Sequence, residues 1–142
     1  MSAQRLYTPE LLALAVDLAK WPPLESGRHG EARSPTCGST LALDLDLDEA
    51  GRIKKFGMRV RACAVGQAAA AIFARNAAGR DQAELADALA QLESWLAHDG
   101  VVPAWPGIDP LVPARAYPAR HGAMLLPWKA ALAALSSTAP AG

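Results

Sequence analysis

The chain has 142 residues, of which 51% are hydrophobic and 20% are charged. This length and composition suit one folded domain with a buried core. Its 14 basic and 14 acidic residues give a formal net charge of zero, which argues against bulk attraction to nucleic acid or to anionic lipid.

The amino-terminal segment predicts an amphipathic helix. Thr8 is a suitable N-cap and Pro9 a suitable first helical residue, and leucines recur at helical spacing until Pro22 and Pro23 end the pattern. No apolar run in the chain approaches the roughly 18 residues of a membrane span. We therefore expect a cytoplasmic protein with no membrane or nucleic-acid partner, in which the two cysteines are not paired in a disulfide.

Two antiparallel strands are predicted within residues 39–61. The first has leucines on one face and acids on the other: Leu41, Leu43, Leu45 and Leu47 alternate with Ala42, Asp44, Asp46 and Asp48. In the second strand Phe56, Met58 and Val60 share a face, and Ile53 is out of phase with them, which predicts a bulge near Lys54. We expect the acidic face of the first strand to lie opposite the basic residues of the second.

Helices are predicted elsewhere. An alanine-rich helix follows Cys63, a capping box of Asp81 and Glu84 begins another helix that ends near His98, and a last helix covers residues 123–135. The sequence thus predicts an α+β fold, with a small antiparallel sheet of about three strands and helices packed on one face.

The connecting segments leave two possible positions for the third strand. Residues 24–36 and the proline-rich residues 100–119 are predicted to be loops, yet the third strand must lie near 24–34 or near 112–119. We expect one domain over residues 1–142, with residues 136–142 as a disordered tail.

The chemistry of the sequence centres on its two cysteines. Cys37 lies in the loop before the first strand, in "SPTCGS", and Cys63 lies where the second strand gives way to a helix, in "RACAVG". Because the strands are antiparallel, both cysteines belong at the same end of the hairpin. The field of the helix N-terminus favours a thiolate at Cys63; the alternative is that each cysteine is a small hydrophobic residue.

The candidates for a third ligand are few. His121 ends the proline-rich loop just before the last helix, where it is either a ligand or an ordinary surface histidine. There is no phosphate-binding loop, dinucleotide fingerprint, nucleophile elbow or Cys-x-x-Cys motif.

Together these segments resemble a known family. "LYTPELLALA", "PTCGSTLALDLDLDEAGRIKKFGMRVRACAVGQAAAAIFA" and "YPARHGAMLLPWKAALAAL" are similar to the NifU N-terminal/IscU family of iron–sulfur cluster assembly scaffolds, most closely to its SufU-like branch. The resemblance covers residues 6–135. By position, Cys37 and Cys63 match the first two cysteine ligands. The aspartate of the family falls on Ser39, and the third cysteine falls on Ala123, or on Gly122 if the histidine of the IscU branch is aligned with His121.

The resemblance implies a scaffold or carrier that is not an enzyme. It would receive sulfur from a cysteine desulfurase, hold a labile cluster of the 2Fe–2S type, and pass it to recipient apoproteins, as a monomer or weak homodimer. The ligands it implies are Cys37 and Cys63, and we add His121 as the third. One alternative is a zinc- or iron-binding sulfur acceptor of the SufU type, and another is a metal-free interaction module of the assembly machinery.

Overall fold

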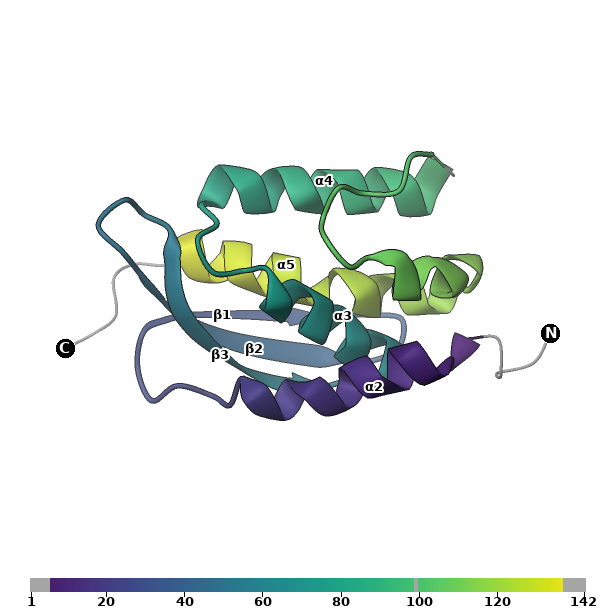
Figure 1. Ribbon diagram of the computed structural model, residues 1–142, viewed down its shortest axis with the longest axis horizontal. Coiled ribbons are helices and arrows are strands. Elements are labelled where there is room, and N and C mark those ends of the chain that lie inside the picture. The colour runs from purple at the N-terminus through teal and green to yellow at the C-terminus, as the bar shows by residue number, and fades with distance from the viewer. Residues whose placement is uncertain (1–5, 99, 137–142) are drawn as a thin grey trace.

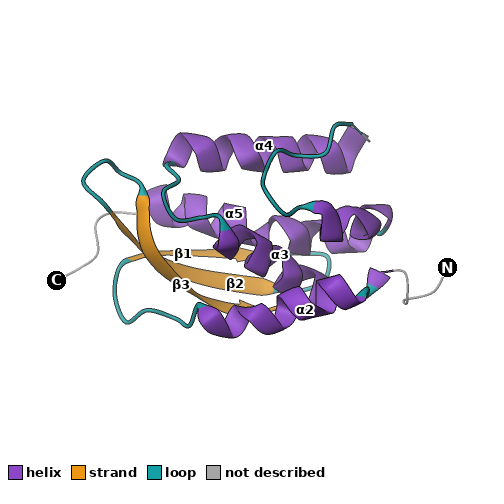
Figure 2. Ribbon diagram, viewed as in Figure 1, coloured by secondary structure: helices purple, strands orange, loops and turns teal. Residues whose placement is uncertain are grey.

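The computed structural model of the chain, which describes residues 6–98 and 100–136, combines a small sheet with a layer of helices (Figure 1). The sheet has three antiparallel strands in the order β1-β2-β3, and the helices lie over one of its faces (Figure 2). The predicted α+β fold class is therefore confirmed. In the part of the chain that the structure describes, no helix has the length and apolar character needed to cross a membrane.

The leucine alternation places the central strand. β2 spans Thr40–Leu47 and pairs with β1, Arg28–Arg33, on one side and with β3, Ile53–Arg61, on the other. Leu41, Leu43 and Leu45 are fully buried on its covered face. The predicted bulge is confirmed, because Asp46 pairs with Lys55 while the next residue, Leu47, pairs with Ile53.

The polar faces of β2 and β3 match less well than the sequence suggested. Asp46 does lie opposite Lys55, with an Oδ2–Nζ distance of 3.7 Å. Arg59 and Arg61, however, lie opposite Ala42 and Thr40. The reason is the antiparallel direction: the acids of β2 lie toward the β2–β3 turn and the arginines of β3 lie away from it.

The third strand corrects the prediction of a loop over residues 24–36, and of its two expected positions the one near 24–34 is right. β1 escapes sequence detection because its core-facing residues are small. Gly30 faces α5, and a Cβ atom at this position would lie 2.1 Å from the carbonyl oxygen of Ala130. Only a glycine lets the helix approach the sheet this closely.

The helices form in the order the sequence predicts, and their described bounds are α2 Pro9–Asp17, α3 Ala64–Arg75, α4 Gln82–His98 and α5 His121–Ser136. The Thr8 cap is confirmed, because its Oγ1 accepts a hydrogen bond from the Leu11 amide at 3.2 Å. α5 packs between the sheet and α4, and α3 packs between α2 and α5 (Figure 1). The residues of the expected disordered tail lie outside the described part of the chain, except for Ser136, which ends α5.

The prediction of a loop over residues 100–119 is partly wrong. The segment contains two 3₁₀ helices, η2 at Asp109–Ala116 and η3 at Pro118–Arg120. It is also fixed to the core, because the indole Nε1 of Trp105 donates to the Ile72 carbonyl at 3.0 Å and its ring stacks on Phe73 at a centroid distance of 5.7 Å. Buried aromatic contacts of this kind hold the segment in place despite its prolines.

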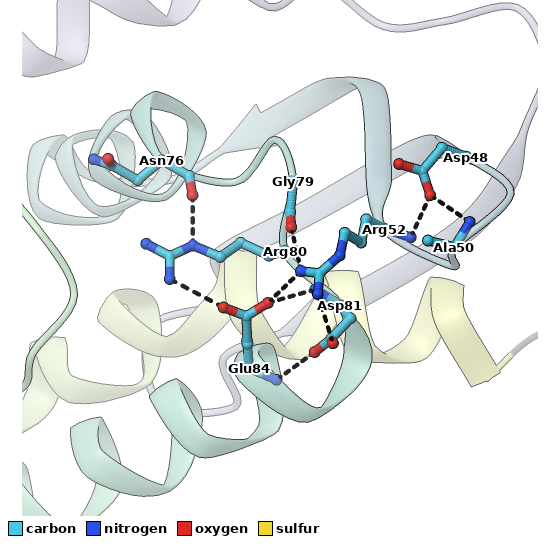
Figure 3. A network of polar contacts seen from close by, with 8 residues as sticks. All are labelled: Asp48, Ala50, Arg52, Asn76, Gly79, Arg80, Asp81 and Glu84. Carbon is cyan, nitrogen blue, oxygen red and sulfur yellow. Dashed lines mark hydrogen bonds and ion pairs between the residues drawn. The ribbon is translucent and has the colours of Figure 1, made fainter.

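A polar network closes the end of the molecule where β2 turns into β3 (Figure 3). The predicted capping box is confirmed: the Glu84 amide donates to Asp81 Oδ1 at 2.9 Å, and the Asp81 amide donates to Glu84 Oε1 at 3.2 Å. Arg52 from β3's turn donates to the Gly79 carbonyl at 2.9 Å and to Glu84 at 3.0 Å. Arg80 contacts the same carboxylate at 3.6 Å. The network ties the hairpin to the start of α4.

Candidate functional site

Cys37 lies at the tip of the loop that joins β1 to β2. Arg33 and Thr40 are the last pair of the ladder, and the loop between them is closed by two backbone hydrogen bonds, from the Ser34 amide to the Ser39 carbonyl at 2.8 Å and from the Gly38 amide to the Ser34 carbonyl at 2.8 Å. Gly38 has a φ of +72°, which glycine adopts without strain. The tight turn holds the Cys37 side chain exposed to solvent.

Two buried hydroxyl groups surround the Cys37 sulfur. Its Sγ lies 3.3 Å from Ser34 Oγ and 3.1 Å from Ser39 Oγ. Donation from Ser34, then from Ser39 and its backbone amide, together with the positive charge of Arg120, lowers the pKa of the Cys37 thiol below its ordinary value. Both serines are almost fully buried, at 1% and 5% exposure, so the hydroxyls stay in place. The arrangement favours an exposed thiolate.

Cys63 is the residue that precedes the first turn of α3. It is half-buried and its side chain makes no capping hydrogen bond. The sequence predicted a thiolate at Cys63 because of the helix N-terminus. The structure gives a lowered pKa to Cys37, because hydroxyl donors and Arg120 lie beside that sulfur.

Both cysteines belong to the same end of the sheet, as predicted. Thr40 pairs with Arg61 in the register of β2 and β3. Cys37 comes three residues before Thr40, and Cys63 comes two residues after Arg61.

The start of α5 lies between the Cys37 loop and the first turn of α3. A Cβ atom at Gly122 would lie 2.4 Å from Ser34 Oγ, and a Cβ atom at Gly66 would lie 3.3 Å from the Cβ of Ala123. Thr36 Oγ1 of the loop donates to the Ala119 carbonyl at 3.4 Å. Three segments distant in sequence therefore meet here: the Cys37 loop, the start of α3, and the junction of η3 with α5.

His121 is the first residue of α5, and its ring contacts the backbone of η2. Its Nε2 lies 2.7 Å from the carbonyl oxygen of Arg115. Among the described residues, no three histidine, cysteine, aspartate or glutamate side chains are grouped closely enough to hold a metal ion. Cys37, Cys63 and His121 are thus not arranged as a ready ligand set in this structure.

Comparison with solved structures identifies the fold. The crystal structure of a nitrogen-fixing NifU-like protein (N-terminal) from Brucella abortus superposes with a TM-score of 0.82 at 29% sequence identity, covering 90% of each chain. The chain has the NifU/IscU-like fold. A putative iron–sulfur cluster assembly scaffold protein for the SUF system from Fervidobacterium islandicum AW-1 shares the fold, with a TM-score of 0.82 at 20% identity over 95% of this chain and 100% of that one. No family model and no curated protein matches the sequence.

Residues that pack occupy the positions at which the sequence resemblance would place a third cysteine and an aspartate. Ala123 is completely buried, and Gly122 has no space for a side chain beside Ser34. Ser39, in the aspartate position, is buried and bonded to Cys37. Zinc sites require at least three protein ligands, and iron–sulfur clusters four thiolate or imidazole ligands. The two thiolates do not fit a metal site that is complete within one chain.

Sequence reasoning missed Ser34 and Arg120, and placed Ser39 only at the position of the family's aspartate. Ser34 and Ser39 flank Cys37 at positions −3 and +2 in "SPTCGS". That spacing in a tight loop is the signal that could have indicated hydroxyl donors to the sulfur. Arg120, far away in sequence, carries no such signal.

Proposed function

We propose that this NifU/IscU-like protein acts in iron–sulfur cluster assembly as a scaffold-type carrier whose working group is the Cys37 thiolate. The observation that carries the proposal is the exposed Cys37 sulfur held between the buried hydroxyls of Ser34 and Ser39, with its pKa lowered. The similarity to a nitrogen-fixing NifU-like protein and to a putative iron–sulfur cluster assembly scaffold protein supports the pathway. The partners we propose are a cysteine desulfurase as sulfur donor and apoproteins as recipients.

The chemical step is sulfur transfer. The Cys37 thiolate attacks the outer sulfur of a persulfide on the donor cysteine, a new S–S bond forms at Cys37, the donor S–S bond breaks, and the donor cysteine leaves as a thiolate. One disulfide-type bond replaces another, so no external oxidant or reductant is needed. The lowered pKa of the Cys37 thiol increases the ionised fraction of the nucleophile, and the exposure of Cys37 admits the donor.

Cys63 is proposed as the second thiolate at the same end of the sheet. Two thiolates hold iron or a cluster as transient cargo and leave its remaining positions to other ligands. His121 is the third ligand that we propose, and it would first have to release the Arg115 carbonyl that its ring contacts at 2.7 Å. A zinc-binding sulfur acceptor is the alternative with the same residues.

A metal-free interaction module is the second candidate function. It is favoured by one observation: the third-ligand position is filled by tight packing of Gly122 against Ser34 and of Ala123 against Gly66. Metal and sulfide analysis after anaerobic purification separates the three functions. Iron with acid-labile sulfide supports the carrier, zinc alone the acceptor, and the absence of both the module.

The test of the acceptor role uses a desulfurase charged with ³⁵S-cysteine. We expect label on the wild-type chain, loss of it in Cys37→Ser, and retention of at least part of it in Cys63→Ser. Transfer that is unaffected by Cys37→Ser would overturn the proposal. His121→Ala tests the ligand set: it should weaken iron or zinc binding, while His98→Ala should leave binding unchanged.

A further inference from the structure

The face of the sheet opposite the helices carries a groove at the end nearest the cysteines. It has a volume of about 480 Å³ and is lined by residues of all three strands. We call it the arginine groove, after its three basic side chains, Arg33, Arg59 and Arg61. Arg33 precedes the Cys37 loop and Arg61 precedes Cys63 by two residues, so the groove adjoins the candidate site.

The register places these arginines together. Arg33, Thr40 and Arg61 form one row across β1, β2 and β3, and Glu31, Ala42 and Arg59 form the next row on the same face. Directly paired residues of an antiparallel sheet point to one face, and the neighbouring residue Leu41 is buried on the other face. Small side chains in the middle strand, Thr40 and Ala42, leave the groove open between the arginines.

The positive charge of the groove is not neutralised within the described chain. Arg33, Arg59 and Arg61 are exposed and form no ion pair with any residue that the structure describes. The one acid that lines the groove, Glu31, has its Oε2 at 2.6 Å from the Nε2 of His29, outside the groove. Three guanidinium groups are therefore available to an anionic partner.

We propose that the arginine groove docks an extended acidic segment of the protein that exchanges sulfur or cargo at Cys37. Arg59 and Arg61 are alternate residues of one strand, which places their Cα atoms about 6.8 Å apart. Carboxylates on alternate residues of an extended chain have the same spacing, so each guanidinium can pair with one of them. Arg33, two strands away at roughly 9.6 Å, holds the other side of the segment.

The acidic protein segment is favoured over nucleic acid by the rest of the surface. The sheet face carries Glu31, Asp44 and Asp46 beside the arginines, and the chain has no net charge. Nucleic-acid interfaces are much more uniformly positive. The identity of the partner rests on the proposed function, but the docking itself does not depend on sulfur chemistry.

The test uses a fluorescein-labelled peptide of alternating glutamate and serine, with fluorescence anisotropy as the readout. We expect the double variant Arg59→Glu/Arg61→Glu to bind it roughly tenfold more weakly than the wild type, as expected for the loss of two exposed ion pairs and their replacement by repulsion. Lys54→Glu/Lys129→Glu is the matched control, because it makes the same change of net charge at two exposed positions outside the groove. It should bind nearly as the wild type does.

The other outcomes are distinguishable. Absence of peptide binding, or equal weakening in both double variants, would overturn the proposal. Binding of a (dT)₆ oligonucleotide through the same arginines that is tighter than binding of the peptide would also overturn the proposal. So would displacement of the peptide by inorganic phosphate at a concentration that supplies the same total negative charge. Sulfur transfer from polysulfide to Cys37, which needs no docked protein, should be unchanged in Arg59→Glu/Arg61→Glu. Failure of the docking test would therefore leave the sulfur-acceptor proposal intact. Failure of the sulfur-transfer test would likewise leave the docking proposal intact.

Discussion

The two ends of the sheet differ in whether their charged side chains are paired. At the β2–β3 turn, the carboxylates and guanidinium groups of Arg52, Arg80, Asp81 and Glu84 contact one another, and Asp48 accepts from two backbone amides of the turn (Figure 3). At the cysteine end, no acid among the described residues forms an ion pair with the three guanidinium groups of the arginine groove, and Cys37 is exposed. The turn end is arranged to hold the fold, and the cysteine end leaves charge and a reactive sulfur available to other molecules.

The comparison also separates two kinds of packing beneath the polar groups. The cysteine end is tightly closed where the family would place a third ligand, at Gly122 and Ala123. It is open at the Cys37 sulfur and along the arginine groove. Close packing around exposed polar groups that lack a partner is typical of a functional site supported by a rigid scaffold.

The largest effect on stability should come from adding one methyl group at Gly122, which packs closely against Ser34. In Gly122→Ala the new Cβ would lie 2.4 Å from Ser34 Oγ and 3.1 Å from Ser34 Cβ. Because Ser34 is buried, the Cys37 loop must move, and we expect a loss of about 1–3 kcal/mol in the free energy of unfolding. Urea denaturation measures it. Gly100→Ala is the matched control, because nothing lies within 4 Å of a Cβ there. Equal stabilities of the two variants would show that the position is not closed.

The next effect concerns the reactivity of Cys37. Removing a hydroxyl donor in Ser39→Ala should raise the pKa of the Cys37 thiol, since the thiolate loses one of its hydrogen bonds. We expect the rate of alkylation by iodoacetamide at pH 7 to fall by up to about tenfold, and the midpoint of its pH profile to move to higher pH. Cys63→Ser provides the background in which only Cys37 reacts. Ser94→Ala on α4 should leave the pH profile of alkylation unchanged. If Ser39→Ala also kept the wild-type profile, the Ser39 hydroxyl would have no role in the reactivity of Cys37.

How far the sequence predicts this molecule depends on how each feature is encoded. β2 was predictable because a buried face of leucines alternates with polar residues, and the bulge at Lys54 was predictable because Ile53 breaks the same period. β1 was not, because its contact with α5 requires Gly30 and leaves no hydrophobic alternation. The period of side chains reveals an element only where large apolar residues mark its buried face.

Part of the candidate site was likewise predictable from the sequence, and part was not. The shared location of Cys37 and Cys63 followed from the hairpin alone. The donors to the Cys37 sulfur did not, because Ser34 and Ser39 act through a loop geometry and Arg120 comes from a segment far away in the chain. The contact of His121 with the Arg115 carbonyl was equally hidden, since η2 was expected to be an extended loop.

A smaller effect is expected at the turn end. Arg52→Ala removes the contacts with Gly79 and Glu84, all of them on exposed groups. Exposed ion pairs contribute little, so we expect a loss of about 0.5–1 kcal/mol in the free energy of unfolding. Thermal denaturation at low and at high salt measures it, and the loss should shrink at high salt. Arg59→Ala in the arginine groove is the matched control and should cause no loss, because Arg59 has no acid partner within the described chain. A larger loss for Arg59→Ala than for Arg52→Ala would reverse the comparison between the two ends.

The smallest effect lies between the two ends, at His29. Hydrogen bonds to Glu31 and then to Asp44 raise the pKa of its imidazole above the ordinary value of 6.5. A raised pKa in the folded state means that the protonated ring stabilises the fold below about pH 6.5, and that this contribution is lost as the pH rises through the folded-state pKa. Because the side chain is 49% exposed, we expect no more than about 0.5 kcal/mol. His29→Gln should therefore lower the free energy of unfolding, measured in urea, more at pH 5.5 than at pH 8.5. His98→Gln, at the end of α4, is the control; a loss in His29→Gln that is equal at both pH values, or larger at pH 8.5, would mean that the imidazole does not act through its charge.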